Sequence, residues 1–251
     1  MRVHELLFML SAGFLALGGI APAIAASQYA IISVEPASEG LEPGRVLEVN
    51  DTFDIPPGVT VTLLGDDGTV SAVPGPAHVT ITDDGGGDSG DERRSALAKV
   101  AGLLAGEDAN AQSLGAARAI DDGSNGGGKG IEPWAIPVDR DSNGCARGEE
   151  VLLGRDDPRQ ALPVALEADG ELLAELTWPQ GDSVLTLPRG NSAELSEFDF
   201  RASGSSVRVT LHRLPEDMSE NDPLAVLGWM IDSGCDRQAM GFARNLALQA
   251  Q

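Results

Sequence analysis

Basic, aromatic and sulfur-containing side chains are scarce in this sequence. Its 251 residues contain 17 Lys+Arg against 39 Asp+Glu, 3 His and 2 Cys, and 4% of them are aromatic. The formal net charge of −22 argues against a nucleic-acid or anionic-membrane surface, because both need a basic footprint. Few aromatics also argue against the stacking subsites of a glycosidase. Residues typical of turns are abundant: the chain has 31 Gly and 15 Pro. This composition favours short strands joined by turns over a helical bundle.

The first segment of the chain predicts export. Residues 1–25 combine a basic start at Arg2, an apolar run over 6–20 and the small-x-small pattern Ala23-Ile24-Ala25, which is typical of a cleavable signal peptide. The run is shorter than the roughly 20 residues that span a bilayer, so a retained anchor is the weaker alternative. We expect a periplasmic or secreted protein with no transmembrane segment after signal removal.

Export determines how the two cysteines are interpreted. An isolated pair in an oxidising compartment predicts a disulfide between Cys145 and Cys235. A redox-active pair is the alternative, but neither residue stands in a C-x-x-C motif.

Residues 26–84 have the pattern of a small β module. Short apolar runs alternate with Pro-Gly and Asp-Gly turns. Strands are expected at residues 30–34, 45–49, 59–64, 69–73 and 78–82.

The turn residues of this module also carry a family resemblance. Leu41-Glu-Pro-Gly44, the segment Ile55–Leu64, Asp67-Gly68 and Val73-Pro-Gly-Pro-Ala77 follow one another in a cadence that resembles FecR-like periplasmic β domains. The resemblance implies an extracytoplasmic β module. Sensor members of that family carry a cytoplasmic helical segment and a membrane span before this region, where this chain has a cleavable signal, so their anti-sigma role is not implied.

Residues 85–130 are expected to form a Gly-rich acidic linker. Within it, residues 92–104 place Leu97, Val100, Leu103 and Leu104 on one face of a short amphipathic helix. Such a helix packs on a neighbouring domain or binds a partner, and the first alternative is the commoner.

Residues 131–251 predict an antiparallel β-sandwich followed by a helical hairpin. Strands are expected at residues 151–153, 162–166, 171–178, 183–187, 197–201 and 206–211. Asp222-Pro223 marks the start of one helix, and Asp236 is expected to cap a second. Trp134 and Trp178 are candidate core residues, and the two-Trp, two-Cys arrangement resembles uncharacterised proteobacterial exported proteins.

One acidic segment fits the calcium-loop pattern D-x-D-x-N-G-x5-E. Its oxygen ligands would be Asp139, Asp141, Asn143 and Glu150. Pro133 and Pro137 argue against the entering helix of an EF-hand, and the bridge requires the intervening Cys145. A solvated acidic turn is therefore the main interpretation, and a calcium site remains the alternative.

Two other motifs only partly match catalytic loops. Residues 123–130 imitate a phosphate loop as far as Lys129, but Asp121-Asp122 precedes them and would repel phosphate. Gly87-Asp-Ser-Gly90 resembles a protease nucleophile loop, yet the only histidines after residue 25, at 78 and 212, are expected on the solvent faces of strands. Two His and a bridged Cys pair also leave too few ligands for a classical zinc site. We expect no catalytic residues and no cofactor.

The sequence thus predicts a mainly β protein with a small N-terminal β module, a linker with a short helix, and a C-terminal sandwich followed by helices. The expected function is non-catalytic: a periplasmic binding or scaffold module whose partner is another envelope component rather than nucleic acid. The residues expected to hold this structure are Cys145, Cys235, Trp134, Trp178 and Trp229. A calcium-binding adhesion or matrix protein and a hydrolase without a recognised motif remain as alternatives.

Overall fold

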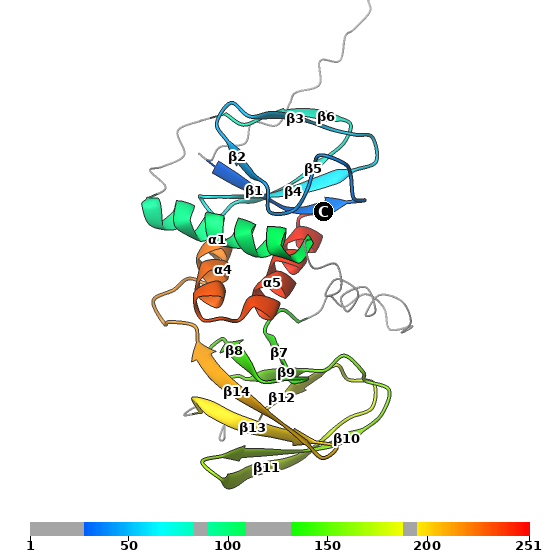
Figure 1. Cartoon of the computed structure of the whole chain (residues 1–251), viewed down its shortest axis with the longest axis vertical. Helices are drawn as coiled ribbons and strands as arrows, with labels where there is room; N and C mark the ends of the chain where they lie inside the picture. Colours follow the sequence, from blue (N-terminus) through cyan, green and yellow to red (C-terminus); the bar gives the residue numbers. More distant parts are fainter. Residues whose placement is uncertain (1–27, 83–89, 109–131, 188–194) are drawn as a thin grey trace, which may run out of the picture.

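The computed structural model describes residues 28–82, 90–108, 132–187 and 195–251. The predicted signal peptide and most of the predicted linker, including the two partial catalytic motifs at 87–90 and 123–130, lie largely or wholly outside these residues. The fold is mainly β, as predicted. Figure 1 shows three tiers, with the N-terminal strands at one end, the helices of the described residues in the middle and the later strands at the other end.

The first tier is built from six short strands. An antiparallel sheet has the order β2-β1-β4-β5, and β3 pairs with β6 beside it. The bounds are β1 Gln28–Glu35, β2 Val46–Glu48, β3 Thr52–Ile55, β4 Thr60–Gly65, β5 Val70–Pro74 and β6 Ala77–Thr80. Strand β1 is buried on both faces: Tyr29 and Ile31 pack with the other strands, while Ala30 and Ile32 face the helices.

The middle tier consists of α1 Asp91–Asp108, α4 Pro223–Asp232 and α5 Asp236–Gln249. Leu97 and Val100 of α1 are buried against α4 and β1, so the amphipathic face of this helix packs within its own chain. Asp222 caps α4 as predicted, because its side chain accepts a hydrogen bond of 3.1 Å from the N–H of Ala225. The predicted cap of the second helix is different: Cys235 occupies that position and makes no side-chain capping bond.

The third tier contains two sheets that enclose a separate core. One has the order β11-β10-β13-β14-β8 and the other β12-β9-β7. The bounds are β7 Ala135–Pro137, β8 Ser142–Ala146, β9 Leu152–Gly154, β10 Leu162–Ala168, β11 Glu171–Trp178, β12 Val184–Thr186, β13 Glu197–Ala202 and β14 Ser205–Arg213. In this core, Trp178 of β11 meets Phe200 of β13, a strand of the same sheet, edge to face at 6.3 Å.

These sheets are mixed rather than purely antiparallel. Strand β8 runs parallel to β14, and β7 runs parallel to β9. Strand β8 lies inside the segment 139–150 that the sequence assigns to an acidic turn, and β7 lies just before it. The polar residues Ser142 and Asn143 carry little β-preference of their own, so neighbouring strands rather than local sequence make this segment extended.

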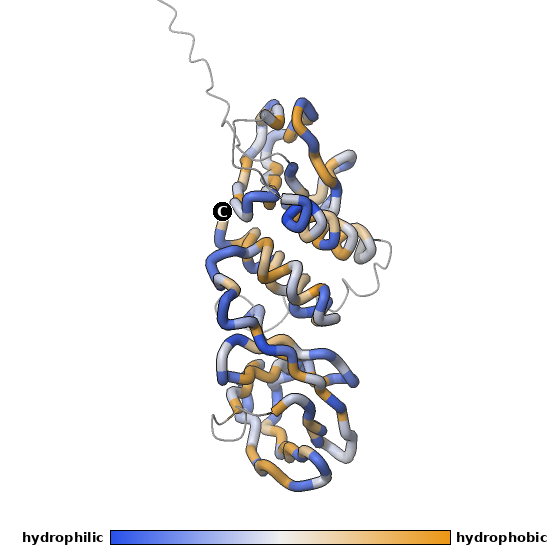
Figure 2. Tube along the Cα trace, turned by 90° about the vertical axis from the view of Figure 1, so that its left-hand side faces the viewer, coloured by the Kyte–Doolittle hydropathy of each residue, from blue (hydrophilic) through white to orange (hydrophobic). Residues whose placement is uncertain are grey.

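The helices after β14 return to the first tier. Residues of α4 and α5 form one buried cluster with α1 and with Ala30, Ile32 and Leu64 of the first sheet. In sequence these helices follow the second β module, but in space they complete the core of the first. Figure 2, turned by 90°, shows the same three tiers. Within the described ranges, no helix is long and apolar enough to cross a membrane.

Candidate functional site

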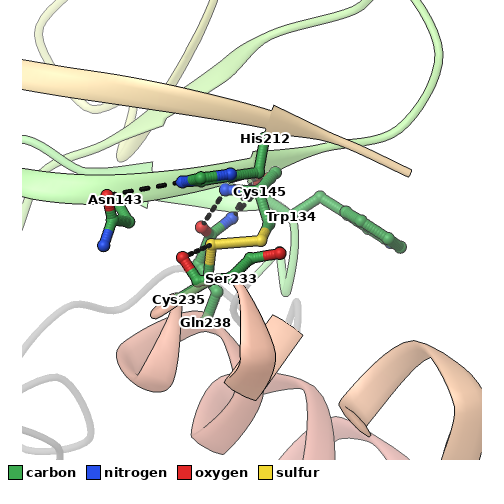
Figure 3. Close-up of a disulfide and its surroundings, with 7 residues drawn as sticks. All are labelled: Trp134, Asn143, Cys145, His212, Ser233, Cys235 and Gln238. Carbon is green, nitrogen blue, oxygen red and sulfur yellow. Dashed lines mark hydrogen bonds between the residues drawn. A yellow bond between two sulfur atoms is a disulfide. The ribbon is translucent and has the colours of Figure 1, made fainter. Parts of the chain in front are cut away.

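A disulfide ties the second β module to the helical tier. Cys145 lies on β8 and Cys235 precedes α5, and they are bonded across 90 residues of sequence (Figure 3). The predicted bridge is therefore confirmed. Both residues are buried, Cys145 completely, so the bond lies inside the junction between the two modules.

Gln238, on the first turn of α5, closes the edge of the sheet at this bond. Its Oε1 accepts a hydrogen bond of 2.7 Å from the N–H of Cys145, and its Nε2 donates to the carbonyls of Cys145 at 2.9 Å and Trp134 at 3.0 Å. Strand β8 is the outer strand of its sheet. The carboxamide therefore occupies the place that the next strand would take, and it satisfies backbone groups that would otherwise be buried without partners.

The sequence prediction did not include Gln238 among the residues that matter. The residues expected to face inward on this helix were Met240, Ala243 and Leu246. In the structure Gln238 is 3% exposed, whereas Met240 and Leu246 are only partly buried. The available signal was its position three residues after Cys235, because residues three apart share one helix face.

Trp134 anchors the same junction from the chain that leads into β7. Its ring lies 6.4 Å from that of Trp229 and 5.9 Å from that of Phe242, which it meets edge to face. The guanidinium of Arg147 lies over the Trp134 ring at 5.9 Å. Trp134 therefore packs into the helical tier, while the other predicted core residue, Trp178, belongs to the core of the sandwich.

An ion pair completes the junction. The guanidinium of Arg237 on α5 bonds Oδ1 of Asp139 in the connection between β7 and β8, and Arg140 contacts the other carboxylate oxygen at 3.1 Å. Burial raises the pKa of Asp139, but the hydrogen bond and charge of Arg237 outweigh it, with help from Arg140, and the net pKa lies below its ordinary value. Asp139 is therefore held ionised as a contact between α5 and the second module.

The structure distributes the four calcium-pattern residues among separate partners. Asp139 bonds Arg237, Asp141 accepts a 2.8 Å bond from the N–H of Arg208, and Asn143 contacts His212 at 3.4 Å. Glu150 is partly buried just before β9. Within the described residues, no group of three or more His, Cys, Asp or Glu side chains is placed to hold a metal. The calcium alternative therefore rests on the sequence pattern alone.

Gly144, which the calcium pattern assigns to a turn, lies inside strand β8. A Cβ at this position would approach Ile136 Cδ1 to 2.6 Å. Glycine is therefore needed here for the close packing of β7 on β8 rather than for a turn.

No protein-family model, curated protein or solved structure matches this chain. The chemistry of the junction must therefore be judged from its own residues.

The two histidines considered as catalytic bases lie in different modules. His78 is on β6 and bonds Asp54 at 2.7 Å on an exposed surface, while His212 is on β14 beside Asn143. The serine of the protease-like motif, Ser89, is outside the described residues. What the structure brings together at the junction is a bridged cysteine pair, a buried carboxamide, indole rings and an ion pair, an arrangement suited to holding two modules in fixed positions.

A second organising residue, Arg155, was also absent from the sequence prediction. Its guanidinium donates to the carbonyls of Asp182 at 3.0 Å, Gln160 at 2.8 Å and Pro179 at 2.6 Å, and it lies 5.0 Å from the centre of the Trp178 ring. One side chain thus fixes the loops that follow β9 and β11 at the end of the sandwich.

Proposed function

We propose that this protein is an exported, non-catalytic binding or scaffold protein of the periplasm that presents its surface to another envelope component. The observation that carries the proposal is the junction of Cys145–Cys235, Gln238 and Asp139–Arg237. It fixes the second β module against the helices that complete the first. A scaffold needs this property, because two surfaces can act together only if their separation is constant.

The disulfide also supports the proposed location. Disulfides persist in oxidising compartments such as the periplasm and are rare in the cytosol. The predicted signal peptide and the resemblance of residues 26–84 to FecR-like domains favour the same location. The periplasm is therefore where a partner should be sought.

Site-specific photocrosslinking in intact cells tests the proposal. A photoreactive phenylalanine analogue is placed singly at three exposed positions: Glu39 in the first tier, Arg244 in the helical tier and Leu172 in the third. A scaffold with a defined partner is expected to give one dominant adduct at one of these positions and weak signal at the other two. Equal, diffuse adducts at all three would contradict the proposal.

A control separates binding from folding. The same crosslinker is introduced into a variant with Cys145 and Cys235 both changed to alanine. If a fixed junction matters, the dominant adduct should weaken while the variant remains folded by circular dichroism. An adduct of unchanged strength would show that the partner binds one module alone.

A further inference from the structure

An open depression of about 710 Å³ lies on the five-stranded sheet of the third tier. It is formed by β10, β11, β13 and the turn into β14, and the first three of these strands lie at the end of the tier far from the helices (Figure 1). The sequence gives a reason for the hollow. The pairing of β10 with β13 stops at Val164–Ala202, and the preceding residue of β10 is Pro163, which has no N–H to donate. The ladder therefore does not continue to the turn at residues 203–204, and the sheet surface stays open there.

One row of side chains crosses this depression. Ala165 on β10 is paired with Glu175 on β11 and with Arg201 on β13, and all three line the hollow. Residues paired across strands direct their side chains to the same face. Val164 and Phe200, the neighbours of this row along β10 and β13, are buried in the sandwich core, so the row itself faces solvent. A small apolar side chain thus lies between an acid and a base.

The two charged groups can each bond a ligand of opposite charge. Among the described residues, none forms an ion pair with the carboxylate of Glu175. Arg201 contacts Glu167 at 2.9 Å through one nitrogen, and a guanidinium carries five N–H donors, so others can bond a carboxylate. The hydroxyls of Thr177 and Ser206 line the same depression and can bond a peptide group. The occupant should therefore carry a cation at one end, an anion at the other and polar groups between them.

The separation of the two charges limits the length of the ligand. Neighbouring strands lie about 4.8 Å apart, so the Cα atoms of Glu175 and Arg201, on either side of β10, are about 10 Å apart. Each residue of an extended peptide spans about 3.5 Å, and a charge-assisted hydrogen bond adds about 2.8 Å at each end. A dipeptide with its contacts thus spans about 13 Å and a tripeptide about 16 Å. Both side chains are long and exposed, so they can splay enough to bracket a dipeptide.

We propose that this depression binds a dipeptide in its zwitterionic form. The ammonium lies beside Glu175, the carboxylate beside Arg201 and small side chains over Ala165. Such a ligand has no net charge, so the formal charge of −22 on the protein does not repel it. A diamine would place a cation against Arg201, and a dicarboxylate would place an anion against Glu175. The site goes beyond the proposed scaffold function, because it takes a small ligand rather than a protein partner.

The probe is dialanine, and binding to the full-length protein is followed by amide chemical shifts in NMR spectra. We expect saturable shifts at residues 164–165, 175–177 and 201–206, which line the depression. Alanine has both charges but no peptide group, N-acetyl-dialanine lacks the cation, and dialanine amide lacks the anion. Each of these three should bind at least about fivefold more weakly than dialanine. Shifts confined to other residues, no shifts, or any of the three binding as tightly as dialanine would overturn the proposal.

Substitutions assign each end of the ligand to one side chain. Glu175→Gln should bind dialanine and N-acetyl-dialanine equally, yet still prefer dialanine to its amide. Arg201→Gln should show the reverse, losing only the preference over the amide. The matched control is Glu171→Gln, which removes the same charge from the same strand outside the depression and should leave every affinity unchanged. Equal effects of the Glu171 and Glu175 substitutions, or loss of both preferences in one variant, would refute the assignment.

The outcome can be told apart from that of the proposed function. If dialanine produces no shifts in the depression while crosslinking in cells gives one dominant adduct, the ligand site fails and the scaffold function stands. Diffuse adducts at every position would instead remove the proposed function and leave the dipeptide site to its own test.

Discussion

Replacing Gln238 with alanine is expected to lower the free energy of unfolding by about 3 kcal/mol. The side chain is 3% exposed and makes three hydrogen bonds to the backbone of Cys145 and Trp134. A hydrogen bond of this kind contributes about 1 kcal/mol net to the free energy of unfolding. Water cannot replace the three lost bonds, because the backbone groups of Cys145 and Trp134 stay buried in the variant. The disulfide keeps Cys145 next to α5 in the variant, so these groups cannot easily move to water.

Urea denaturation followed by tryptophan fluorescence measures this loss. The matched control is Gln249→Ala on the same helix, since Gln249 is exposed and bonds only Asn245 among the described residues. The control should change stability by less than about 0.5 kcal/mol. Equal effects of the two substitutions would refute the role assigned to Gln238.

A nearly isosteric variant gives a sharper test. Gln238→Glu retains an oxygen for the N–H of Cys145 but turns a carboxylate oxygen toward two carbonyls. Burial and these carbonyls should raise the folded-state pKa of this carboxyl above its unfolded value of about 4.3. The variant should therefore be nearest to wild-type stability below that pH and lose stability as the pH rises through the folded pKa. A stability difference from wild type that is independent of pH would contradict the geometry.

Three further outcomes are expected. Changing Cys145 and Cys235 together to alanine should cost up to about 4 to 5 kcal/mol in urea unfolding, because the bond closes a loop across 90 residues; a loss below about 1 kcal/mol would refute this estimate. Burial raises the pKa of Asp222, but its hydrogen bond with Arg93 has the larger effect, so the net pKa in the folded protein lies below the ordinary value. The stability that this pair contributes is therefore present above the unfolded pKa of about 3.9 and is lost as the pH falls through the lower folded pKa. Asp222→Asn should flatten this acid dependence in unfolding measured from pH 6 to pH 2, and a curve as steep as wild type would contradict it. Arg155→Lys loses the planar fork that bonds three carbonyls and should cost about 1 to 2 kcal/mol in thermal unfolding, whereas an unchanged midpoint would show that the loops hold without it.

Much of the fold was predictable because turn chemistry and period-two alternation agree locally. Ala168-Asp-Gly170 illustrates this agreement. Asp169 and Gly170 adopt positive φ values of 53° and 79°, as a tight hairpin turn requires. Strand β10 ends directly before this turn and β11 begins directly after it. The strand expected at 171–178 has the observed bounds. Neither strand depends on distant residues for its definition.

The elements that escaped prediction depend on distant partners. Strand β8 has a polar sequence with a glycine, and it is extended because β14 pairs with it on one side and Gln238 bonds it on the other. The one local signal for Gln238 is its position three residues after Cys235, and that spacing does not reveal that its carboxamide bonds the backbone of a distant strand. The same applies to the placement of α4 and α5, since an apolar helix face does not indicate which of two cores it completes.

The return of α4 and α5 to the first sheet has a consequence for biosynthesis. Residues 28–82 and helix α1 leave the ribosome long before residues 223–249, yet Ala30, Ile32 and Leu64 share one buried cluster with those late helices as well as with α1. Until α4 and α5 are made, only α1 can cover this face of the nascent sheet, while the intervening sandwich can already assemble its own core. A chain truncated after the sandwich would therefore leave the first sheet, at the opposite end of the molecule, incompletely covered. Its strands, which are made first, would then be prone to aggregate.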